Sequence, residues 1–375
     1  MSLQAVQTSG GGFFMYPETG KETGYFIIFI IKGELILKLL SIALIAVMSS
    51  LLSIRGLAIS DDNYQEDWAN KVNPFFLKHT QTNYFYSKHN DLYIYYGLMQ
   101  NTTINSNHRI VVIVPGRKEP FYKYSELAYD LYQYGYSIAL IDHRGQGGSE
   151  RILNDPEKGY VEDYDYYVDD LEQFVDSIVG ELSMEKTYLL AQSMGASIGA
   201  MLMEKRPDIF NKAVLSSPMM MPNTGKYPAP IAVSLMAVLK LVGKAEEYAP
   251  GESGYALSEF AGNTLTSSKA RFDMKNDVFE STPEFKLGGV TVNWLYSVIS
   301  KSYGFVFKYR KVSTPILMLY SNNDQVVLPK YEEKFCDKAK ACESVLFSQS
   351  KHEIFMEADE IRDNALNETL KFLAE

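Results

Sequence analysis

Short apolar runs alternate along the chain with longer stretches in which apolar residues recur at helical spacing. Two runs, at residues 84–86 and 92–99, flank the polar segment 88–91 and predict a β-hairpin. The run Arg109–Val114 is apolar after its first residue, which is typical of a strand buried on both faces. Further strands are predicted at Ser137–Ile141, 187–191, 213–215, Ile316–Tyr320 and 344–347.

Helical periodicity fills most of the segments between these strands. Helices are predicted at residues 122–134, 163–179, 198–205 and 359–373, and residues 61–80 are polar with a helical rhythm. Strands that alternate with helices in this way indicate an α/β fold with a mostly parallel sheet covered on both faces.

The alternation is interrupted between residues 218 and 310. This part begins with a Pro- and Met-rich passage, contains helical patterns at 231–242 and 293–302, and lacks strand signals over 246–290. We interpret 218–310 as an insertion, a cap over the carboxyl ends of the strands, and 61–217 with 311–375 as the core. The methionines at its start suit either a groove for a lipid chain or packing of the cap on the core.

Residues 1–60 form a leader whose residue pattern differs from that of the rest of the chain. Residues 1–24 lack periodicity, and residues 39–54 are uncharged. A helix of that length spans about 24 Å, less than the ~30 Å hydrocarbon core of a bilayer. Two interpretations are favoured over a buried core helix because the run is so uniformly apolar: a secretory signal peptide, or a membrane anchor that includes the apolar run 25–31. Both leave Lys32 and Lys38 in the cytoplasm, so we expect a periplasmic or membrane-anchored protein of the cell envelope.

Charge and cysteine content narrow the choice of partners. The net charge of −10 disfavours a nucleic-acid partner, which needs a basic face. Cys336 and Cys342 form either a disulfide, which suits an oxidising compartment, or two free thiols, and they do not match a zinc motif. The glycines at 145, 147 and 148 do not form a phosphate-binding loop. We therefore expect neither a cofactor nor a metal.

A serine stands between a predicted strand and a predicted helix. Ser193 follows the run 187–191 and precedes three small residues, Gly195, Ala196 and Ser197. A strand, a sharp turn and a helix present a serine hydroxyl on a strained bend, with the next main-chain N–H free to bind an oxyanion. Taken alone, the motif is equally consistent with an ordinary tight turn, since Ala191 replaces the usual first glycine.

The rest of a catalytic triad follows from chain order. In this type of fold the serine is followed by an acid and then a histidine, and His352 is the only histidine after Ser193. Asp324 lies in a polar turn after the strand Ile316–Tyr320, whereas its competitor Asp337 falls within a helical stretch. We predict Ser193 as nucleophile, His352 as base and Asp324 as the carboxylate that orients the imidazole.

The loop after the strand Arg109–Val114 is the candidate for the oxyanion hole. The main-chain N–H groups of Met194 and Arg117 are predicted to donate to the oxyanion. Glu119 either holds this loop by hydrogen bonding or faces solvent. Asp142 and Arg144 are expected to stabilise their own turn.

Several longer motifs resemble one family, the monoacylglycerol lipase-like α/β-hydrolases, and most closely the bacterial membrane-associated lysophospholipases of the L-two type. The resemblance covers about residues 80–375. It rests on the segments 115–119, 124–131, 142–149, 167–171, 192–195, 265–268 with Arg271, 288–294, and 352–354 with Glu357. Departures are Gln192, where His is usual, and Ala196, where Gly is usual; neither removes a catalytic atom.

The resemblance implies hydrolysis of a carboxyl ester in a single-chain lipid, beneath a cap, by Ser193, Asp324 and His352 with the amides of Arg117 and Met194. The leading hypothesis is a lysophospholipase that acts at a membrane surface. A monoacylglycerol lipase or general carboxylesterase is the neighbouring alternative, and peptidase activity a more distant one. An α/β-hydrolase that binds a ligand without turnover is the alternative from another class.

Overall fold

The computed structural model describes residues 4–7, 13–16, 59–104, 106–225 and 227–375. The chain divides into two compact units, Met1–Gly56 and Leu57–Glu375. In the first unit, strands β1 (Gln4–Gln7) and β2 (Phe13–Tyr16), which the sequence pattern did not predict, pair antiparallel. The predicted signal or anchor segment lies outside the described residues. Among the helices that are described, none has both the length and the apolar character needed to cross a bilayer.

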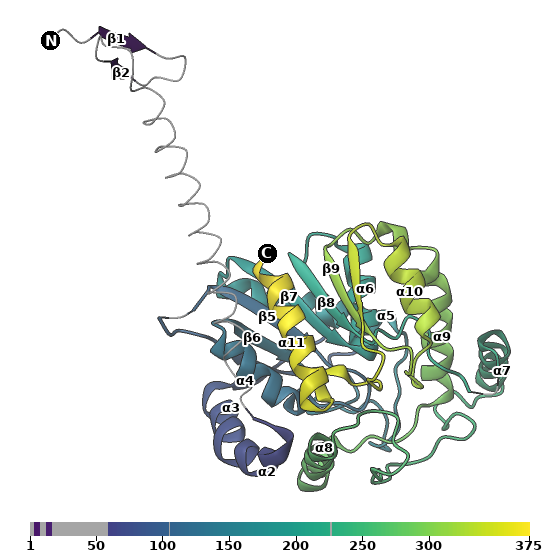
Figure 1. Ribbon diagram of the computed structural model, residues 1–375. Coiled ribbons are helices and arrows are strands. Elements are labelled where there is room, and N and C mark those ends of the chain that lie inside the picture. Colours follow the sequence, from purple (N-terminus) through teal and green to yellow (C-terminus); the bar gives the residue numbers. More distant parts are fainter. Residues whose placement is uncertain (1–3, 8–12, 17–58, 105, 226) are drawn as a thin grey trace. The chain divides into compact units, whose positions relative to one another are not determined.

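The second unit is built on an eight-stranded sheet with the order β10-β9-β8-β7-β5-β6-β4-β3 (Figure 1). Neighbours from β10 to β6 run parallel, and β4 pairs antiparallel with both β6 and β3. The mostly parallel sheet and the predicted hairpin, which is formed by β3 and β4, are therefore confirmed. The strands are β3 (Gln81–Tyr86), β4 (Tyr93–Met99), β5 (Arg109–Val114), β6 (Ser137–Ile141), β7 (Lys186–Gln192), β8 (Lys212–Ser216), β9 (Ile316–Tyr320) and β10 (Cys342–Leu346).

Helices cover both faces of this sheet (Figure 1). One face carries α3 (Asn73–His79), α4 (Ser125–Gln133) and α11 (Asp359–Ala374). The opposite face carries α5 (Asp165–Phe174), α6 (Ser193–Lys205), α9 (Val292–Val306) and α10 (Pro329–Lys338). The remaining helices are α2 (Tyr64–Asp67), α7 (Ala229–Leu241) and α8 (Lys269–Ser281). Short 3-10 or π turns are η1 (Asp61–Asn63), η2 (Trp68–Val72), η3 (Phe121–Tyr124), η4 (Val175–Val179), η5 (Gly180–Leu182), η6 (Pro283–Phe285), η7 (Tyr309–Lys311) and η8 (Ile354–Met356).

The central strand β5 shows why this fold forms. Val111 and Ile113 point into the apolar layer beneath α4 and α11, while Val112 and Val114 point into the layer beneath α5 and α6. All four side chains are fully buried, as the uninterrupted apolar run predicted. Burial of each such side chain stabilises the folded state by about 1.5–3 kcal/mol.

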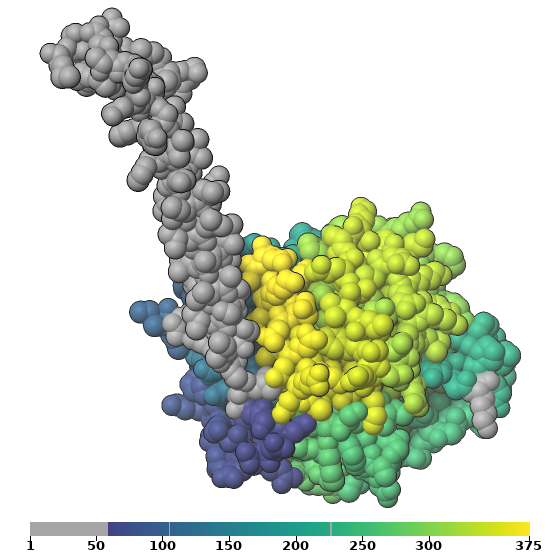
Figure 2. All heavy atoms as spheres, viewed as in Figure 1, coloured from purple at the N-terminus to yellow at the C-terminus, as the bar shows by residue number. Residues whose placement is uncertain are grey.

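The described residues of 218–310 contain α7, α8 and α9 and contribute no strand to the sheet. The helix α8 was missed by the sequence pattern because two of its buried positions are the cations Arg271 and Lys275. Arg271 is fully buried and donates hydrogen bonds to Glu126 of α4 and to Asp359 of α11. Arg271 also pairs with Asp61, and Figure 2 shows that the green α8, the yellow α11 and the purple residues after 58 meet on one face of the molecule.

The structure also decides one open alternative and corrects one expectation. Cys336 and Cys342 form a disulfide, which joins α10 to β10. Arg144 does not stabilise its own turn, so that expectation is wrong: its guanidinium is buried and pairs with Asp170 of α5 at 2.7 Å. A buried guanidinium needs a carboxylate partner, and Arg144 finds this partner on α5 rather than within its own turn.

Candidate active site

The predicted serine lies on a strained bend at the end of a central strand. β7 ends at Gln192, and Ser193 opens α6 with φ 51°, in the left-handed region that non-glycine residues rarely adopt. A Cβ atom at Gly195 would lie 2.4 Å from the carbonyl oxygen of Pro115, so no larger residue fits there. Glycine at position 195 is therefore required by the close approach of α6 to the end of β5.

The structure brings Ser193, His352 and Asp324 together. The imidazole Nε2 of His352 lies 2.9 Å from Ser193 Oγ, and its Nδ1 lies 2.6 Å from a carboxylate oxygen of Asp324. A carboxylate accepts hydrogen bonds, so Nδ1 carries the proton and Nε2 is left to accept from the hydroxyl. All three side chains are buried. Their arrangement is that of an activated nucleophile, a base and an orienting acid.

The two loops that carry the acid and the histidine are held by hydrogen bonds. The Ser321 hydroxyl donates to the carbonyl of Ser350 at 2.6 Å, which joins the turn of Asp324 to the loop of His352. Asp324 also accepts main-chain hydrogen bonds from Val326 and Val327, at 2.7 and 3.1 Å. These contacts fix the carboxylate relative to the imidazole, which limits the reorganisation needed for proton transfer.

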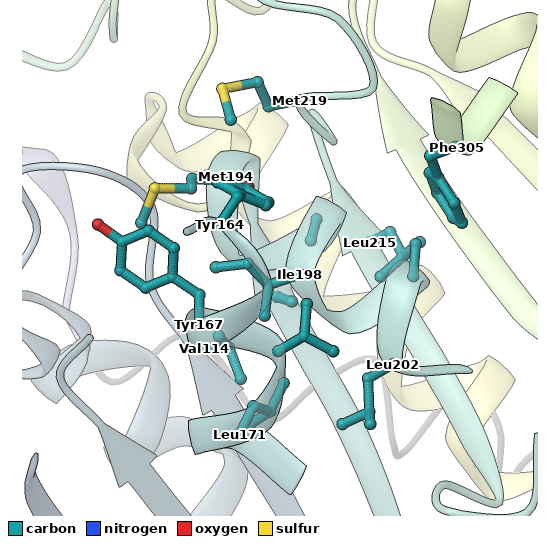
Figure 3. Close-up of a cluster of buried hydrophobic side chains, with 14 of the residues drawn as sticks. Val114, Tyr164, Tyr167, Leu171, Met194, Ile198, Leu202, Leu215, Met219 and Phe305 are labelled. Carbon is teal, nitrogen blue, oxygen red and sulfur yellow. The ribbon is translucent and has the colours of Figure 1, made fainter. Parts of the chain in front are cut away.

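The predicted oxyanion donors belong to two segments that meet at the serine, the first turn of α6 and the turn after β5. Met194 is the second residue of α6, where main-chain N–H groups have no partner within the helix. Its side chain packs in the apolar cluster of Figure 3, near Tyr164 and Tyr167, and thereby fixes the first turn of α6. Arg117 lies in the turn after β5, next to Gly116, whose N–H donates to Glu119 at 2.6 Å. Glu119 thus holds this loop, which decides the alternative left open by the sequence.

A buried charged network that the sequence did not reveal supports the same loop. Lys123 Nζ lies 2.7 Å from Glu119 and 2.8 Å from Glu353, the residue after the histidine. Burial raises the pKa of Glu353, but the charges of Lys123 and Lys275 outweigh it and lower this pKa to about 2. Lys123 therefore links the turn after β5 to the loop that carries His352. The only sequence signal was the spacing of four between Glu119 and Lys123.

The turn after β6 makes hydrogen bonds that hold the loop after β5, which carries the predicted oxyanion donor Arg117. Asp142 accepts hydrogen bonds from the main chain of Phe121 and Gly148, at 2.6 and 2.7 Å, as expected for a residue that stabilises its turn. Burial raises the pKa of Asp142 to about 7. Burial also lowers the pKa of His143 to about 4, so this imidazole is neutral and donates from Nε2 to the carbonyl of Pro115 at 2.9 Å.

Ser193 and His352 open into a cavity of about 360 Å³. One wall is apolar and comes mainly from 218–310, with Met219, Leu287, Val290, Trp294 and Leu295. An apolar wall beside a nucleophilic serine suits an acyl chain. In the part of the chain that the structure describes, no cluster of His, Cys, Asp and Glu is arranged to hold a metal ion.

Comparison of the sequence with known proteins assigns the chain to a protein family. The family described as serine aminopeptidase, S33, a group of α/β-hydrolases, matches residues 105–359. A probable lysophospholipase L2 of Haemophilus influenzae is 32% identical over 303 residues, which cover 80% of this chain and 94% of that protein. Lysophospholipase L2 of Escherichia coli K12 is 31% identical, covering 70% of this chain and 80% of that protein. Human monoglyceride lipase is more distant, at 24% identity over 69% of this chain and 80% of its own.

Solved structures agree on the fold. A soluble variant of monoglyceride lipase from Saccharomyces cerevisiae superposes with a TM-score of 0.61 at 18% identity, over 79% of this chain and 96% of that one. A carboxyl esterase from Bacillus coagulans gives 0.62 at 16% identity, over 79% and 98%. At such identities the likeness concerns the fold alone. The family match and the relatives above 30% identity show that the chain belongs to the α/β-hydrolases of the serine aminopeptidase S33 family, and is related within it to lysophospholipase L2.

Proposed function

We propose that this protein is a serine carboxyl-ester hydrolase that releases the fatty acid from lysophospholipids. The observation that carries the proposal is the hydrogen-bonded series Ser193, His352 and Asp324 on the wall of a partly apolar cavity. The relatives named lysophospholipase L2 support this substrate class.

In the proposed reaction, Ser193 Oγ attacks the ester carbonyl while Nε2 of His352 takes its proton. Asp324 holds the proton on Nδ1 and stabilises the imidazolium that forms. The main-chain N–H groups of Met194 and Arg117 donate to the oxyanion; removal of one such donor typically costs 10²–10³-fold in kcat. His352 then protonates the departing glycerol oxygen, which leaves the acyl group on Ser193.

Deacylation repeats the sequence with water as nucleophile. His352 removes a proton from the water, the resulting hydroxide attacks the acyl carbonyl, and the serine oxygen leaves with the proton from the imidazolium. The products are a fatty acid and the glycerophosphodiester. No cofactor takes part in this scheme.

The proposal includes a cap and a membrane surface. Residues 218–310 would act as the cap, because they supply most of the apolar wall above Ser193. Contact with the lipid surface would involve α7, which exposes Ile231, Leu235, Val238 and Leu241 along one side. The predicted leader would place the enzyme in the cell envelope, in the periplasm or anchored to the membrane.

A substrate panel tests the proposed activity. Purified protein is incubated with lysophosphatidylcholine, monoolein and p-nitrophenyl butyrate, and the products are identified by mass spectrometry. Release of fatty acid from lysophosphatidylcholine with the highest kcat/KM, lost in Ser193→Ala, is the expected result. A preference for monoolein or for the short ester would instead favour a monoacylglycerol lipase or a general carboxylesterase.

A fluorophosphonate probe tests the non-enzymatic alternative. A serine activated by an imidazole at 2.9 Å reacts with such a probe, whereas an inert binding protein does not. Labelling of the wild type and none of Ser193→Ala is expected. An unlabelled wild type that hydrolyses none of the three esters would contradict an enzymatic function.

A further inference from the structure

Three cationic side chains face the cavity beside Ser193. Arg117 and Lys118 come from the turn after β5, and Lys275 comes from α8. Lys275 is buried and Lys118 is half-buried, so their ammonium groups are partly withdrawn from water. None of these three charges acts on the reacting atoms in the proposed ester hydrolysis, because the oxyanion donors are main-chain groups.

None of these cations forms an ion pair within the described part of the chain. The carboxylates of Glu119 and Glu353 are already shared by Lys123, at 2.7 and 2.8 Å. The guanidinium of Arg117 donates to the carbonyl of Gly288 at 2.7 Å and lies over the ring of Trp294, but its Nε is buried without a hydrogen-bond partner. One further carboxylate, that of Glu252, lines the cavity and accepts a main-chain hydrogen bond from Val290.

Burial and mutual repulsion make the cluster costly without a ligand. Burial, and then the charge of Arg117, lower the pKa of Lys118 to about 8. Burial lowers the pKa of Arg117 to about 10. Lys118 also has φ 62°, a left-handed conformation that is unfavourable for a non-glycine residue and is concentrated at functional sites. A bound anion would supply the charge-assisted hydrogen bonds that the protein does not provide.

We propose that Arg117, Lys118 and Lys275 form a subsite that binds the phosphodiester of a lysophospholipid head group while the ester carbonyl lies at Ser193. This inference rests on the proposed function and names the feature that selects the substrate. The main-chain N–H of Arg117 is a predicted donor to the carbonyl oxygen of the substrate ester. Lys118 is the next residue in the chain, so its side chain starts close to that carbonyl group. Only the three glycerol carbons separate ester and phosphate in a lysophospholipid, and a monoacylglycerol has a neutral hydroxyl in place of the phosphate.

The apolar and cationic parts of the cavity then have separate tasks. The apolar wall, with Leu287 and Leu295 among its members, takes the acyl chain, and the cations take the polar end. A lipid bound in this way has one orientation at Ser193. Selection acts through charge, because a site built to pair with a phosphate rejects a ligand that leaves its cations unpaired.

Binding of head-group fragments tests the subsite without requiring turnover. Glycerophosphocholine, inorganic phosphate and glycerol are titrated into the full-length protein by calorimetry. We expect glycerophosphocholine to bind more tightly than inorganic phosphate, and glycerol not to bind. Lys118→Gln and Lys275→Gln should each weaken glycerophosphocholine binding at least tenfold. The control is Lys269→Gln, also on α8, whose ammonium is exposed and paired with Asp273, and which should bind like the wild type.

Two results would overturn the inference. Equal affinity of wild type, Lys118→Gln and Lys275→Gln for glycerophosphocholine would remove these lysines from the site. Binding of inorganic phosphate as tight as that of the diester would make it a site for free phosphate rather than for a head group. Circular dichroism of each variant separates loss of binding from loss of folding, and Lys275→Arg, which keeps the charge, should restore binding if Lys275→Gln is misfolded.

Kinetics separate this inference from the proposed function. The ratio of kcat/KM for lysophosphatidylcholine to that for monoolein should fall at least tenfold in Lys118→Gln, mainly through KM, and remain unchanged in Lys269→Gln. An unchanged ratio in an active Lys118→Gln enzyme would overturn the subsite and leave the hydrolase function standing. A wild type that hydrolyses neither lipid, yet binds glycerophosphocholine through Lys118, would overturn the function and leave the anion subsite standing.

Discussion

The side-chain amide of Gln192 donates a hydrogen bond of 3.1 Å to the main-chain carbonyl of His352. The residue before the nucleophile therefore positions the backbone of the base. Both groups are buried, so water cannot replace the bond without a rearrangement. Gln192 stands where the resemblance leads one to expect histidine, and this contact is a physical reason for an amide at that position.

Loss of this hydrogen bond should slow catalysis more than it weakens substrate binding. Gln192→Ala leaves the carbonyl of His352 unpaired and lets the imidazole shift relative to Ser193. We expect kcat for p-nitrophenyl butyrate to fall by about tenfold with little change in KM, and the free energy of unfolding to fall by about 1 kcal/mol. Steady-state kinetics and urea unfolding measure the two effects. A variant with unchanged kcat would show that Gln192 does not position the base.

Asparagine in place of Asp324 should disable the imidazole while it preserves the shape of the site. The amide can donate to Nδ1 of His352, which would move the imidazole proton to Nε2 and leave that nitrogen unable to accept from Ser193. We expect kcat to fall by about 10⁴-fold for Asp324→Asn. Asp337→Asn, the competitor in sequence order, lies in α10 and is the matched control. A larger loss in Asp337→Asn would mean that the acid had been misassigned.

Glu332 of α10 should make stability depend on pH. Both of its carboxylate oxygens are buried without hydrogen-bond partners among the described residues. Burial, followed by the charge of Asp324, raises the pKa of Glu332 well above its ordinary value. Because the folded-state pKa is the higher one, this group's contribution to stability is fully present below the unfolded pKa of about 4.3 and is lost as pH rises through the folded pKa.

Glu332→Gln removes this titration, so its stability relative to wild type should increase from pH 5 to pH 8. Urea unfolding at the two values measures the difference, with Glu333→Gln, exposed on the same helix, as the control. A pH-independent difference between wild type and Glu332→Gln would contradict the prediction.

The head-group subsite should weaken in mildly alkaline solution. The pKa of Lys118 is lowered to about 8 by burial and by the charges of Arg117 and Lys275, against the opposing charge of Glu252. Lys118 therefore loses its charge above that pH, whereas a phosphodiester remains anionic. KM for lysophosphatidylcholine should rise above pH 8, and KM for monoolein should not follow it. Lys118→Arg keeps its charge and should move the rise to higher pH; an identical profile in that variant would assign the effect elsewhere.

The exposed apolar side of α7 should matter only for lipid surfaces. The combined variant Ile231→Ser, Leu235→Ser, Val238→Ser removes three side chains that are between 41% and 56% exposed. We expect activity on lysophospholipid in vesicles to fall by about tenfold, with activity on soluble p-nitrophenyl butyrate preserved, because only the first reaction needs contact with a bilayer. Leu77→Ser, which removes a leucine of α3 that is 62% exposed, is the control. A parallel loss on both substrates would indicate a folding defect instead.

Local patterns in the sequence were sufficient for the sheet and for the order of the site residues. The strand Arg109–Val114 was predictable because burial on both faces requires an apolar residue at every position. Ser193, Asp324 and His352 could be selected because a strand-to-helix turn, chain order and a single downstream histidine restrict the choice. Each of these signals lies within a few neighbouring residues or in the order of segments.

Contacts between distant segments could be decided only by the tertiary structure. The sequence did not reveal that Lys123 joins Glu119 to Glu353, that Arg271 joins α8 to Glu126 of α4, or that Lys118 and Lys275 share one cavity. A charged residue in a sequence looks the same whether it faces water or an opposite charge, because its partner is set by the packing of other segments. Apolar periodicity therefore determined the scaffold, whereas the positions of the buried charges, including those of the proposed head-group subsite, were determined by the fold.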